Sequence, residues 1–380
     1  MEMPIPRKAL EPFTDIDVEK LASFILRVQK ANGEISWSIG GKTDPWDHVE
    51  SAMGLSIGGY RAEAERAYEW LAGMQEPDGS WWASYRKGFP EDRTKDTNMS
   101  SYIAVGIYHH YLITKDIEFV RRFWPSVRNG IEYALSLQAS TGQIYWAKNS
   151  EGTVDRMALL TGSSSIFMSL KCALALASIL GARLPQWEVA LKRLGNAIKN
   201  RPNLFNMIKS RYSMDWYYPV LCGAVTGNDA VKRIKKSWNK FVVSGWGVRC
   251  VSDRPWATMA ETAEFVLTLA AIDHFEAAAD VLSWIVNKSY GDGSYWMGVT
   301  FPDAVVWPQE KTSWTTAAIL LAYDALTNMT PAGRLFSHSF WGISNAESVK
   351  SKNHSAGGST PRFGSHTHEL SPDITQVEGM

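Results

Sequence analysis

The chain has 380 residues, of which 45% are hydrophobic and 21% charged, and 39 basic side chains balance 39 acidic ones. This apolar content excludes disorder of the whole chain, and zero net charge argues against nonspecific nucleic-acid binding, which requires a basic surface. Apolar runs fall short of the ~18 residues that a membrane span requires, and the first residues lack the apolar core of a signal peptide.

Apolar residues recur with a helical period along most of the chain. We expect twelve helices, at 17–30, 46–58, 62–75, 97–113, 116–137, 162–181, 185–199, 214–225, 228–240, 255–271, 274–287 and 312–326. No two alternating strands are joined by a two-residue turn, which argues against a mainly β domain. Residues 330–380 are rich in Ser, His, Gly, Asn and Pro, and we expect a polar, disordered tail there.

The connections between these helices alternate between short and long. Gly58-Gly59-Tyr60 is one of the short ones, whereas long loops precede every even-numbered helix. If the helices run up and down, every long loop emerges at the same end. Long loops on a rigid scaffold are where binding and catalytic residues concentrate.

A local signature recurs where odd-numbered helices end, with a Gln, a Gly and then a Trp. Its copies are Gln29–Gly33–Trp37, Gln75–Gly79–Trp81 and Gln138–Gly142–Trp146, with a weaker one at Asn287–Gly293–Trp296. The Gly supplies the left-handed backbone that ends a helix, and the amide can bond the turn that follows. These copies indicate internal repeats of a helical pair.

The segment Gln75-Glu-Pro-Asp-Gly79-Ser-Trp81 resembles the Gln-Trp motif of the α/α-toroid superfamily. Terpene cyclases and protein prenyltransferase β subunits belong to that superfamily, and six-hairpin glycosidases share its architecture. The resemblance implies an all-α fold, an (α/α)6 toroid of six helical hairpins over residues 1–329. It indicates the fold more than the reaction.

The openings of the even-numbered helices combine acids, small polar residues and rings. They contain Asp44-Pro-Trp46-Asp47-His48-Val-Glu50, Asp96-Thr97-Asn98, Thr161-Gly-Ser163, Asp215-Trp216-Tyr217, Asp253-Arg254-Pro-Trp256 with Glu261 and Glu264 beyond, and Thr312-Ser313-Trp314. Helix capping alone explains acids and hydroxyls at helix starts. Capping does not require the neighbouring rings, however, and six openings on one face would surround a single cavity.

Acids beside flat rings suit a sugar, which stacks an apolar face on Trp or Tyr and offers hydroxyls to polar side chains. Cleavage of a glycosidic bond needs two carboxyl groups, one to protonate the leaving oxygen and one to activate water or attack carbon. We predict Asp47 and Asp96 as this pair, with Asp215, Asp253 and Glu261 as alternatives. Predicted substrate-binding residues are Trp46, His48, Trp81, Trp82, Tyr85, Asn98, Trp146, Trp216, Tyr217, Arg254, Trp256, Trp307 and Trp314.

Two other functions stay open at this point. An isoprenoid enzyme would also line a toroid with rings, but the Asp-x-Asp-Asp run of cyclases is missing and no histidine completes a prenyltransferase zinc set with Cys250 and Asp253. A non-catalytic carbohydrate-binding scaffold would lack a carboxyl pair.

The remaining expectations concern cofactors and location. We expect no cofactor or metal, because no Cys or carboxylate is regularly spaced among His338, His354, His366 and His368, the histidines of the last segment. Widely spaced Cys172, Cys222 and Cys250 indicate free thiols in a reducing compartment, and we expect a cytoplasmic enzyme acting on an oligosaccharide or small molecule.

Overall fold

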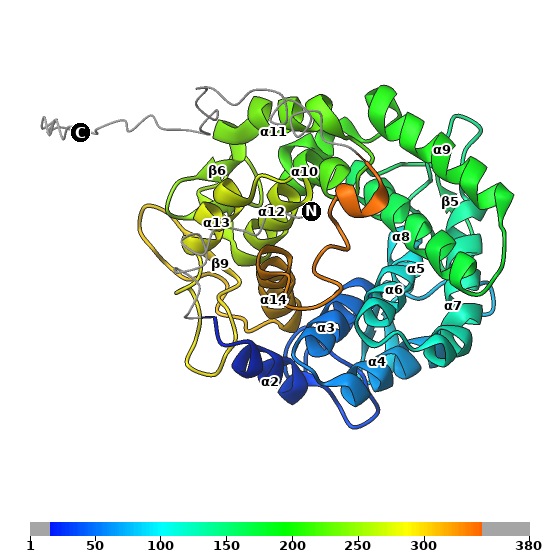
Figure 1. Cartoon of the computed structure of the whole chain (residues 1–380), viewed down its shortest axis with the longest axis horizontal. Coiled ribbons are helices and arrows are strands. Elements are labelled where there is room, and N and C mark those ends of the chain that lie inside the picture. Colours follow the sequence, from blue (N-terminus) through cyan, green and yellow to red (C-terminus); the bar gives the residue numbers. More distant parts are fainter. Residues whose placement is uncertain (1–15, 344–380) are drawn as a thin grey trace, which may run out of the picture. The chain divides into compact units, whose positions relative to one another are not determined.

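The computed structural model describes residues 16–343, which form two concentric rings of helices around one axis (Figure 1). The outer ring comprises α2 (Val18–Val28), α4 (Arg61–Gly73), α7 (Ile117–Ser136), α9 (Pro185–Asn200), α11 (Gly227–Phe241) and α13 (Phe275–Ser283). The inner ring comprises α3 (Pro45–Ile57), α5 (Thr97–Ser101) continued by α6 (Ile103–Thr114), α8 (Leu160–Ile179), α10 (Ser213–Leu221), α12 (Met259–Ala271) and α14 (Ser313–Thr327). Because α14 packs on α3, the inner ring is closed, and the predicted (α/α)6 toroid is confirmed.

Burial separates the two rings as the sequence pattern predicts. All residues of α12 and those of α3 from His48 to Ile57 are buried, because an inner helix has neighbours on every side. The outer helix α11 buries only Ala230, Ile234 and Phe241 along one stripe, as an amphipathic surface helix does. The even-numbered helices of the predicted series therefore form the wall of the central cavity.

The Gln–Gly signature joins three outer helices, α2, α4 and α7, each to the next outer helix. The Nε2 of Gln75 donates to Gly79 O (3.0 Å) and to Ser126 O of α7 (3.0 Å), and Gln29 and Gln138 make the same two kinds of bond. Gly79 has φ +87°, and a Cβ there would lie 2.3 Å from Asn129 O. Only glycine allows this approach between turn and helix.

The fourth copy of the signature is shifted from its predicted position. Ser289, not Asn287, pairs with the residue six positions later, Tyr295, as Gln29 pairs with Ile35 and Gln138 with Ile144. Gly293 then lies four residues after Ser289, and its Cβ would meet Lys20 O of α2 at 2.5 Å. This contact joins the last outer helix to the first.

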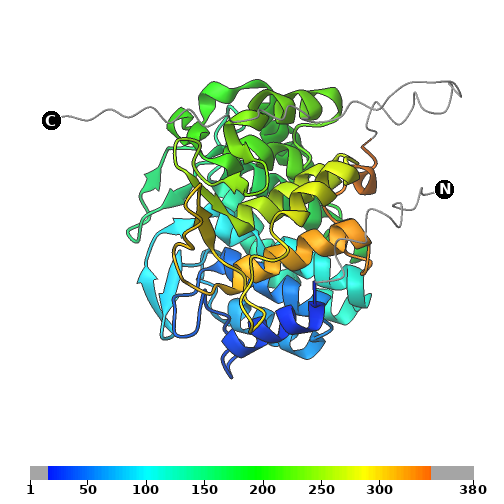
Figure 2. The ribbon, with the colours of Figure 1, turned by 90° about the vertical axis from the view of Figure 1, so that its left-hand side faces the viewer.

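The long loops carry short antiparallel strands that the sequence did not predict. They form the pairs and sheets β1 (Ser84–Arg86)–β2 (Phe89–Asp92), β3 (Lys95–Asp96)–β4 (Ala147–Lys148)–β5 (Val154–Asp155), and β6 (Val242–Val243)–β7 (Gly247–Arg249)–β8 (Trp256–Thr258)–β9 (Gly298–Thr300). Trp256, which the sequence places inside a helix at 255–271, lies in β8, and α12 begins at Met259. Figure 2 shows the strands gathered at one end of the barrel.

Helix α8 has the length and hydropathy of a membrane span, the one helix of residues 16–343 that does. Its most apolar stretch is 67% buried by its neighbours in the barrel. This apolar character is therefore that of an inner helix.

Residues 330–343 are folded, so the prediction that a disordered tail begins at 330 is wrong for this stretch. They include the short helix η4 (Ser339–Trp341) and lie at the end of the barrel opposite the strands (Figures 1 and 2). Leu335 and His338 are buried, and His338 Nε2 donates to Val220 O of α10 (2.7 Å). The Lys171 ammonium lies 4.4 Å from the centre of the Trp341 ring. Residues 344–380, with His354, His366 and His368, lie outside the described residues.

Two further short helices, η2 (Pro202–Leu204) and η3 (Met207–Arg211), belong to the loop between α9 and α10. They carry the chain back to the strand-bearing end of the barrel, where the inner helix α10 begins. The loop ends of all the inner helices are therefore gathered at one mouth.

Candidate active site

Two inner helices, α3 and α12, begin with carboxyl groups spaced three residues apart. Asp47 and Glu50 lie in the first turns of α3, and Glu261 and Glu264 occupy similar places in α12. A spacing of three places both members of a pair on one helix face, one above the other. Each helix therefore presents one carboxyl group near the mouth and a second about one turn deeper.

The deeper carboxyl groups are held by aromatic donors. Trp46 Nε1 (2.9 Å) and the Tyr102 hydroxyl (3.1 Å) donate to Glu50 Oε1. The hydroxyls of Tyr217 (2.5 Å) and Tyr218 (2.7 Å) donate to Glu264. Burial nevertheless raises the pKa of Glu50 to about 7 and raises that of Glu264 well above its ordinary value.

Asp47 is the mouth carboxyl with the most strongly perturbed environment. Its pKa is raised well above the ordinary value, first by burial and then by the negative charges of Asp44, Glu50 and Glu264. Asp44 is itself the N-cap of α3, and its Oδ1 accepts from the Asp47 amide (3.0 Å). Asp47 therefore holds its proton at a pH where an exposed aspartate has lost it.

Glu261 lies at the corresponding place on α12. Its Oε2 is buried and has no hydrogen-bond partner among the residues that the structure describes. The Cys250 thiol hydrogen-bonds to Glu261, and burial with this carboxylate raises the pKa of Cys250 well above its ordinary range. One carboxylate oxygen thus remains available for a substrate or a water molecule.

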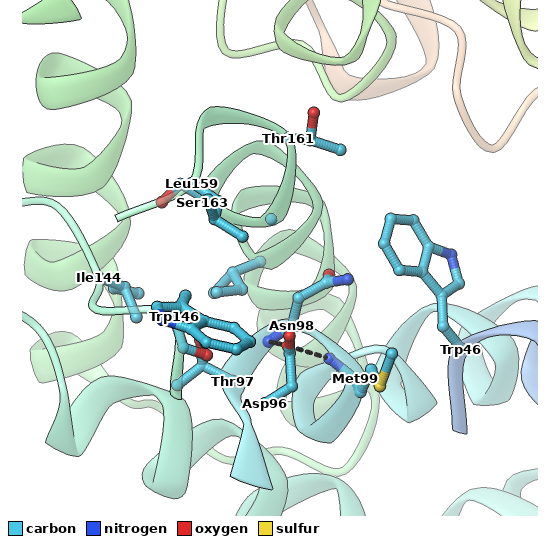
Figure 3. Close-up of a pocket in the computed structure, with 12 residues that line it drawn as sticks. Trp46, Asp96, Thr97, Asn98, Met99, Ile144, Trp146, Leu159, Thr161 and Ser163 are labelled. Carbon is cyan, nitrogen blue, oxygen red and sulfur yellow. Dashed lines mark hydrogen bonds between the residues drawn. The ribbon is translucent and has the colours of Figure 1, made fainter. Parts of the chain in front are cut away.

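A recess opens beside this cluster, between the rings of Trp46 and Trp146 (Figure 3). Its volume is about 120 Å³, and apolar side chains make up much of the wall. The lining residues are Trp46, Asp96, Thr97, Asn98, Met99, Ile144, Trp146, Leu159, Thr161, Gly162, Ser163 and Ile166. Rings and polar groups from separate hairpins therefore meet in one place, as the sequence predicts for Trp46, Asp96, Asn98 and Trp146.

Asp96 and Asp215 are occupied as structural acceptors. Asp96 Oδ1 accepts from the amides of Asn98 (2.7 Å) and Met99 (3.0 Å) and caps α5. Asp215 Oδ1 accepts from the amide (3.1 Å) and hydroxyl (2.6 Å) of Thr161 at the start of α8. Burial raises the pKa of Asp96 to about 6 and that of Asp215 above its ordinary value, although these bonds act in the opposite direction.

Several predicted site residues lie away from the cavity. Asp253 is 61% exposed at its side chain and forms an ion pair with Arg211 (2.8 Å). His48 is buried, accepting from Ile35 N (3.1 Å) and lying 2.9 Å from Ala67 O, so it is a packed histidine. The structure thus contradicts a substrate role for His48 and a cavity position for Asp253.

Three predicted substrate rings are core residues instead. Trp81 is fully buried, and its Nε1 donates to Leu71 O (2.7 Å). The buried Tyr85 donates to Met74 O (3.3 Å), and Trp216 stacks between Phe241 and Phe265. Each ring packs between elements and leaves no face for a substrate.

Other predicted rings lie around the mouth, on the long loops and their strands or at the start of α14. Trp256 and the exposed Trp307 pack edge to face, with Trp256 Nε1 donating to Trp307 O (2.7 Å). Trp314 packs against Trp37, and Trp82 lies under the Lys95 ammonium. Arg254 lies in the same exposed loop as Asp253.

Glu50, Glu264, Tyr102 and Tyr218 were not among the predicted site residues. The repeated spacing of three between acids in α3 and α12 is the signal that would have identified the two glutamates. The tyrosines belong to continuous apolar stretches, at the start of α6 and in α10, and their helical pattern does not distinguish them from core rings.

An (α/α)6 barrel with buried carboxyl groups at its loop-bearing mouth has the architecture of the six-hairpin glycosidases. No family model matches the sequence. The chain is 46% identical over 315 residues to the MMP endo-(1,4)-3-O-methyl-alpha-D-mannosidase of Mycolicibacterium hassiacum, and this match covers 83% of this chain and 87% of that enzyme. The chain belongs to the family of this mannosidase.

Solved structures agree on the fold. A wild-type glycosidase (TM-score 0.59, 14% identity) is covered over its full length by 86% of this chain. The GH63 mannosylglycerate hydrolase of Thermus thermophilus (TM-score 0.62, 12% identity) matches over 79% of this chain and 98% of its own. A D-mannose isomerase shares the fold (TM-score 0.63, 12% identity, 86% of this chain and all of its own), so the barrel itself does not fix the reaction.

The relationship to the mannosidase makes the protein a glycoside hydrolase-like enzyme that acts on oligosaccharides. These similarities give no support to the cyclase and prenyltransferase alternatives. Within residues 16–343, no group of three His, Cys, Asp or Glu side chains could hold a metal ion.

Proposed function

We propose that the enzyme hydrolyses internal α-(1,4) bonds of an oligosaccharide built from 3-O-methyl-mannose. The substrate class is taken from the name of the mannosidase that is 46% identical over most of both chains. The observation that carries the reaction is the carboxyl cluster of α3 and α12, in which Asp47 has a strongly raised pKa. An enclosed acid that keeps its proton beside a second carboxyl group is what glycoside hydrolysis requires.

Asp47 is the proposed general acid, and Glu261 is the proposed second carboxyl group. Asp47 donates its proton to the glycosidic oxygen as the bond from that oxygen to the anomeric carbon breaks. Glu261 has a free oxygen, which accepts a proton from the water that attacks the anomeric carbon, or attacks that carbon itself. The displaced sugar leaves as an alcohol, and water supplies the new anomeric hydroxyl.

The geometry favours Glu261 over Asp96 as the partner of Asp47. Asp96 Oδ1 is already used by two backbone amides at the start of α5. The charges that raise the pKa of Asp47 are those of Asp44, Glu50 and Glu264, and Glu261 lies on the same helix as Glu264, about one turn away. We assign Asp96 to the wall of the recess, where its role is to hold α5 and the adjoining Asn98.

Synthetic α-(1,4)-linked 3-O-methyl-mannotetraose tests this proposal when the products are separated and weighed by mass spectrometry. The wild type should release shorter methylated oligosaccharides. Glu261→Gln should lower kcat by roughly 10²–10⁴-fold, the contribution of a general acid or base. Asp253→Asn, a change at an exposed acid, is the matched control and should keep wild-type turnover. An intact tetrasaccharide after long incubation with the wild type would overturn the proposed function.

We also propose a cytoplasmic enzyme that has no nucleic-acid partner. All three cysteines are free, and Cys172 and Cys222 are buried. Free thiols persist in a reducing compartment. The balance of 39 basic and 39 acidic side chains supports the absence of a nucleic-acid partner.

A further inference from the structure

The recess between Trp46 and Trp146 has a mixed wall whose chemistry goes beyond what cleavage needs. At about 120 Å³ it is far larger than the ~10–15 Å³ that one water molecule needs. Met99 and Ile166 contribute apolar side chains to the wall, Asn98 and Ser163 contribute polar ones, and Trp146 contributes its ring. A free sugar hydroxyl placed against the carbon wall would lose its hydrogen bonds, which disfavours its burial there.

Three polar atoms on residues of this wall are buried and unpaired. Asn98 Oδ1, Ser163 Oγ and Trp146 Nε1 have no hydrogen-bond partner among the described residues. Buried polar atoms are nearly always bonded, so unpaired ones that line a cavity indicate a polar ligand. Together they offer an acceptor, a hydroxyl and an N–H donor, which suits the hydroxyls of one sugar ring.

The recess adjoins the proposed acid. Trp46 forms one wall of the recess, immediately precedes Asp47 and donates to Glu50 through Nε1. Figure 3 shows Trp46 and Trp146 on opposite sides, with Asn98 between them. A sugar held between these rings therefore lies next to the carboxyl cluster.

We propose that this recess is the subsite that selects a 3-O-methylated sugar, with the methyl ether against Met99 and Ile166 and the neighbouring hydroxyls on Asn98, Ser163 and Trp146. This inference rests on the proposed function. A methyl ether has no hydrogen to donate, so it occupies an apolar wall without leaving a donor unsatisfied. The apolar part of the wall thus discriminates against the unmethylated sugar, and the polar part orients the ring.

Gly162 allows the recess to be narrowed without disturbing the fold. It lies in the first turn of α8, and an added Cβ would contact Asn98 Cβ at 3.6 Å and Leu159 Cβ at 3.8 Å, both ordinary contact distances. Alanine also favours a helix over glycine. Gly73→Ala is the matched control, because Gly73 ends α4 at an exposed position with nothing within 4 Å of its added Cβ.

The experiment compares kcat/KM for α-(1,4)-mannotetraose and for the same tetrasaccharide methylated at every O3. The wild type should prefer the methylated substrate. Gly162→Ala should reduce this preference about tenfold, because one extra methyl group in a fitted pocket changes kcat/KM by at least about that factor. Gly73→Ala should leave the preference unchanged. An equal effect of Gly162→Ala on both substrates, or no effect, would overturn the proposal.

Binding gives a second readout that does not depend on turnover. Calorimetric titration of Asp47→Asn with both tetrasaccharides should show tighter binding of the methylated one, and Asp47→Asn/Gly162→Ala should reduce the difference. Trp146→Phe in the same background removes an N–H that bonds no described residue, so it should weaken the binding of both sugars several-fold. If the wild-type enzyme hydrolyses neither tetrasaccharide, the proposed function fails. If the two bind equally, the subsite proposal fails.

Discussion

Acids at the starts of the inner helices follow two patterns, one shown by Asp96 and Asp215 and the other by Asp47 and Glu261. Asp96 and Asp215 accept from backbone amides at the starts of α5 and α8. Asp47 and Glu261 lie inside the first turn of their helices, and Asp44 takes the capping position of α3. The comparison shows that hydrogen bonds from backbone amides, and not position in the helix alone, decide whether an enclosed acid stabilises a helix start or stays available for chemistry, because Asp215 is the third residue of α10 just as Asp47 is the third residue of α3.

The pKa values of Asp96 and Asp47 are raised for different reasons, which follow from the same difference in hydrogen bonding. Two backbone amides oppose the effect of burial on Asp96, whose pKa reaches about 6. For Asp47, burial, the neighbouring negative charges and a hydrogen bond to Asp44 all raise the pKa. An amide that bonds a carboxylate stabilises its charged form, whereas burial and like charges favour the neutral form.

Replacing each acid by its amide is the most direct test of the different roles assigned to Asp47 and Asp96. Asp47→Asn should lower kcat by roughly 10²–10⁴-fold, because the proton donor is lost. Asp96→Asn should lower kcat by less than about tenfold, because Asn caps a helix about as well as Asp. Initial rates on the methylated tetrasaccharide measure both, and equal losses would show that α5 also supplies a catalytic acid.

Asp215→Ala should change stability more than chemistry. The substitution removes the acceptor for the Thr161 amide and hydroxyl, and we expect a loss of about 1–2 kcal/mol in the free energy of unfolding. Denaturant titration provides the measurement, with Asp215→Asn as the control that keeps one acceptor oxygen. Unchanged stability in Asp215→Ala would remove the structural assignment of this residue.

The pH dependence of stability tests the deep carboxyl Glu50. Its pKa is about 7 in the folded chain, against an ordinary value of 4.5. The folded state therefore keeps a proton that the unfolded chain loses, and this contribution to stability is lost as the pH rises through about 7. Glu50→Gln should show a smaller fall in Tm between pH 5 and 8 than the wild type, whereas Glu118→Gln, at an exposed position of α7, should match the wild type.

The smallest expected effect is a displacement of the pH–rate profile. As the general acid, Asp47 must be protonated, so kcat falls as the pH rises through its pKa. The charge of Glu50 is one cause of the raised pKa of Asp47. In Glu50→Gln the alkaline limb of the profile should therefore move to lower pH. An unchanged alkaline limb would show that the charge of Glu50 does not affect the pKa of Asp47.

Much of the fold could be predicted from the sequence because the signals are local. Helical periodicity defines the rings, and the Gln–Gly turns repeat because Gly33 and Gly79 meet the backbone of the next outer helix. The strands β3 and β4 are only two residues long and carry no periodicity. Residues 330–343 contain apolar side chains but carry no clear helical repeat, and Leu335 and His338 are buried only because the assembled barrel covers them.

The site was predictable in outline and less so in detail. Trp46, Asp47, Asn98 and Trp146 could be identified because they lie in the long loops or at the inner helix starts that follow them. Which acids serve as caps depends on exact helix boundaries, which the sequence does not define to one residue. Asp253 shows this most clearly, because the helix expected at 255 begins only at Met259.

The closed far end of the barrel limits how a polysaccharide can approach. Phe336 borders the small cavity beneath Glu50 and Glu264, and the segment from α14 to η4 crosses the axis beyond it (Figure 1). A sugar chain therefore cannot pass through the barrel along its axis. It must lie across the mouth with both of its ends leaving by the same side, which suits the proposed cleavage of internal bonds of an oligosaccharide.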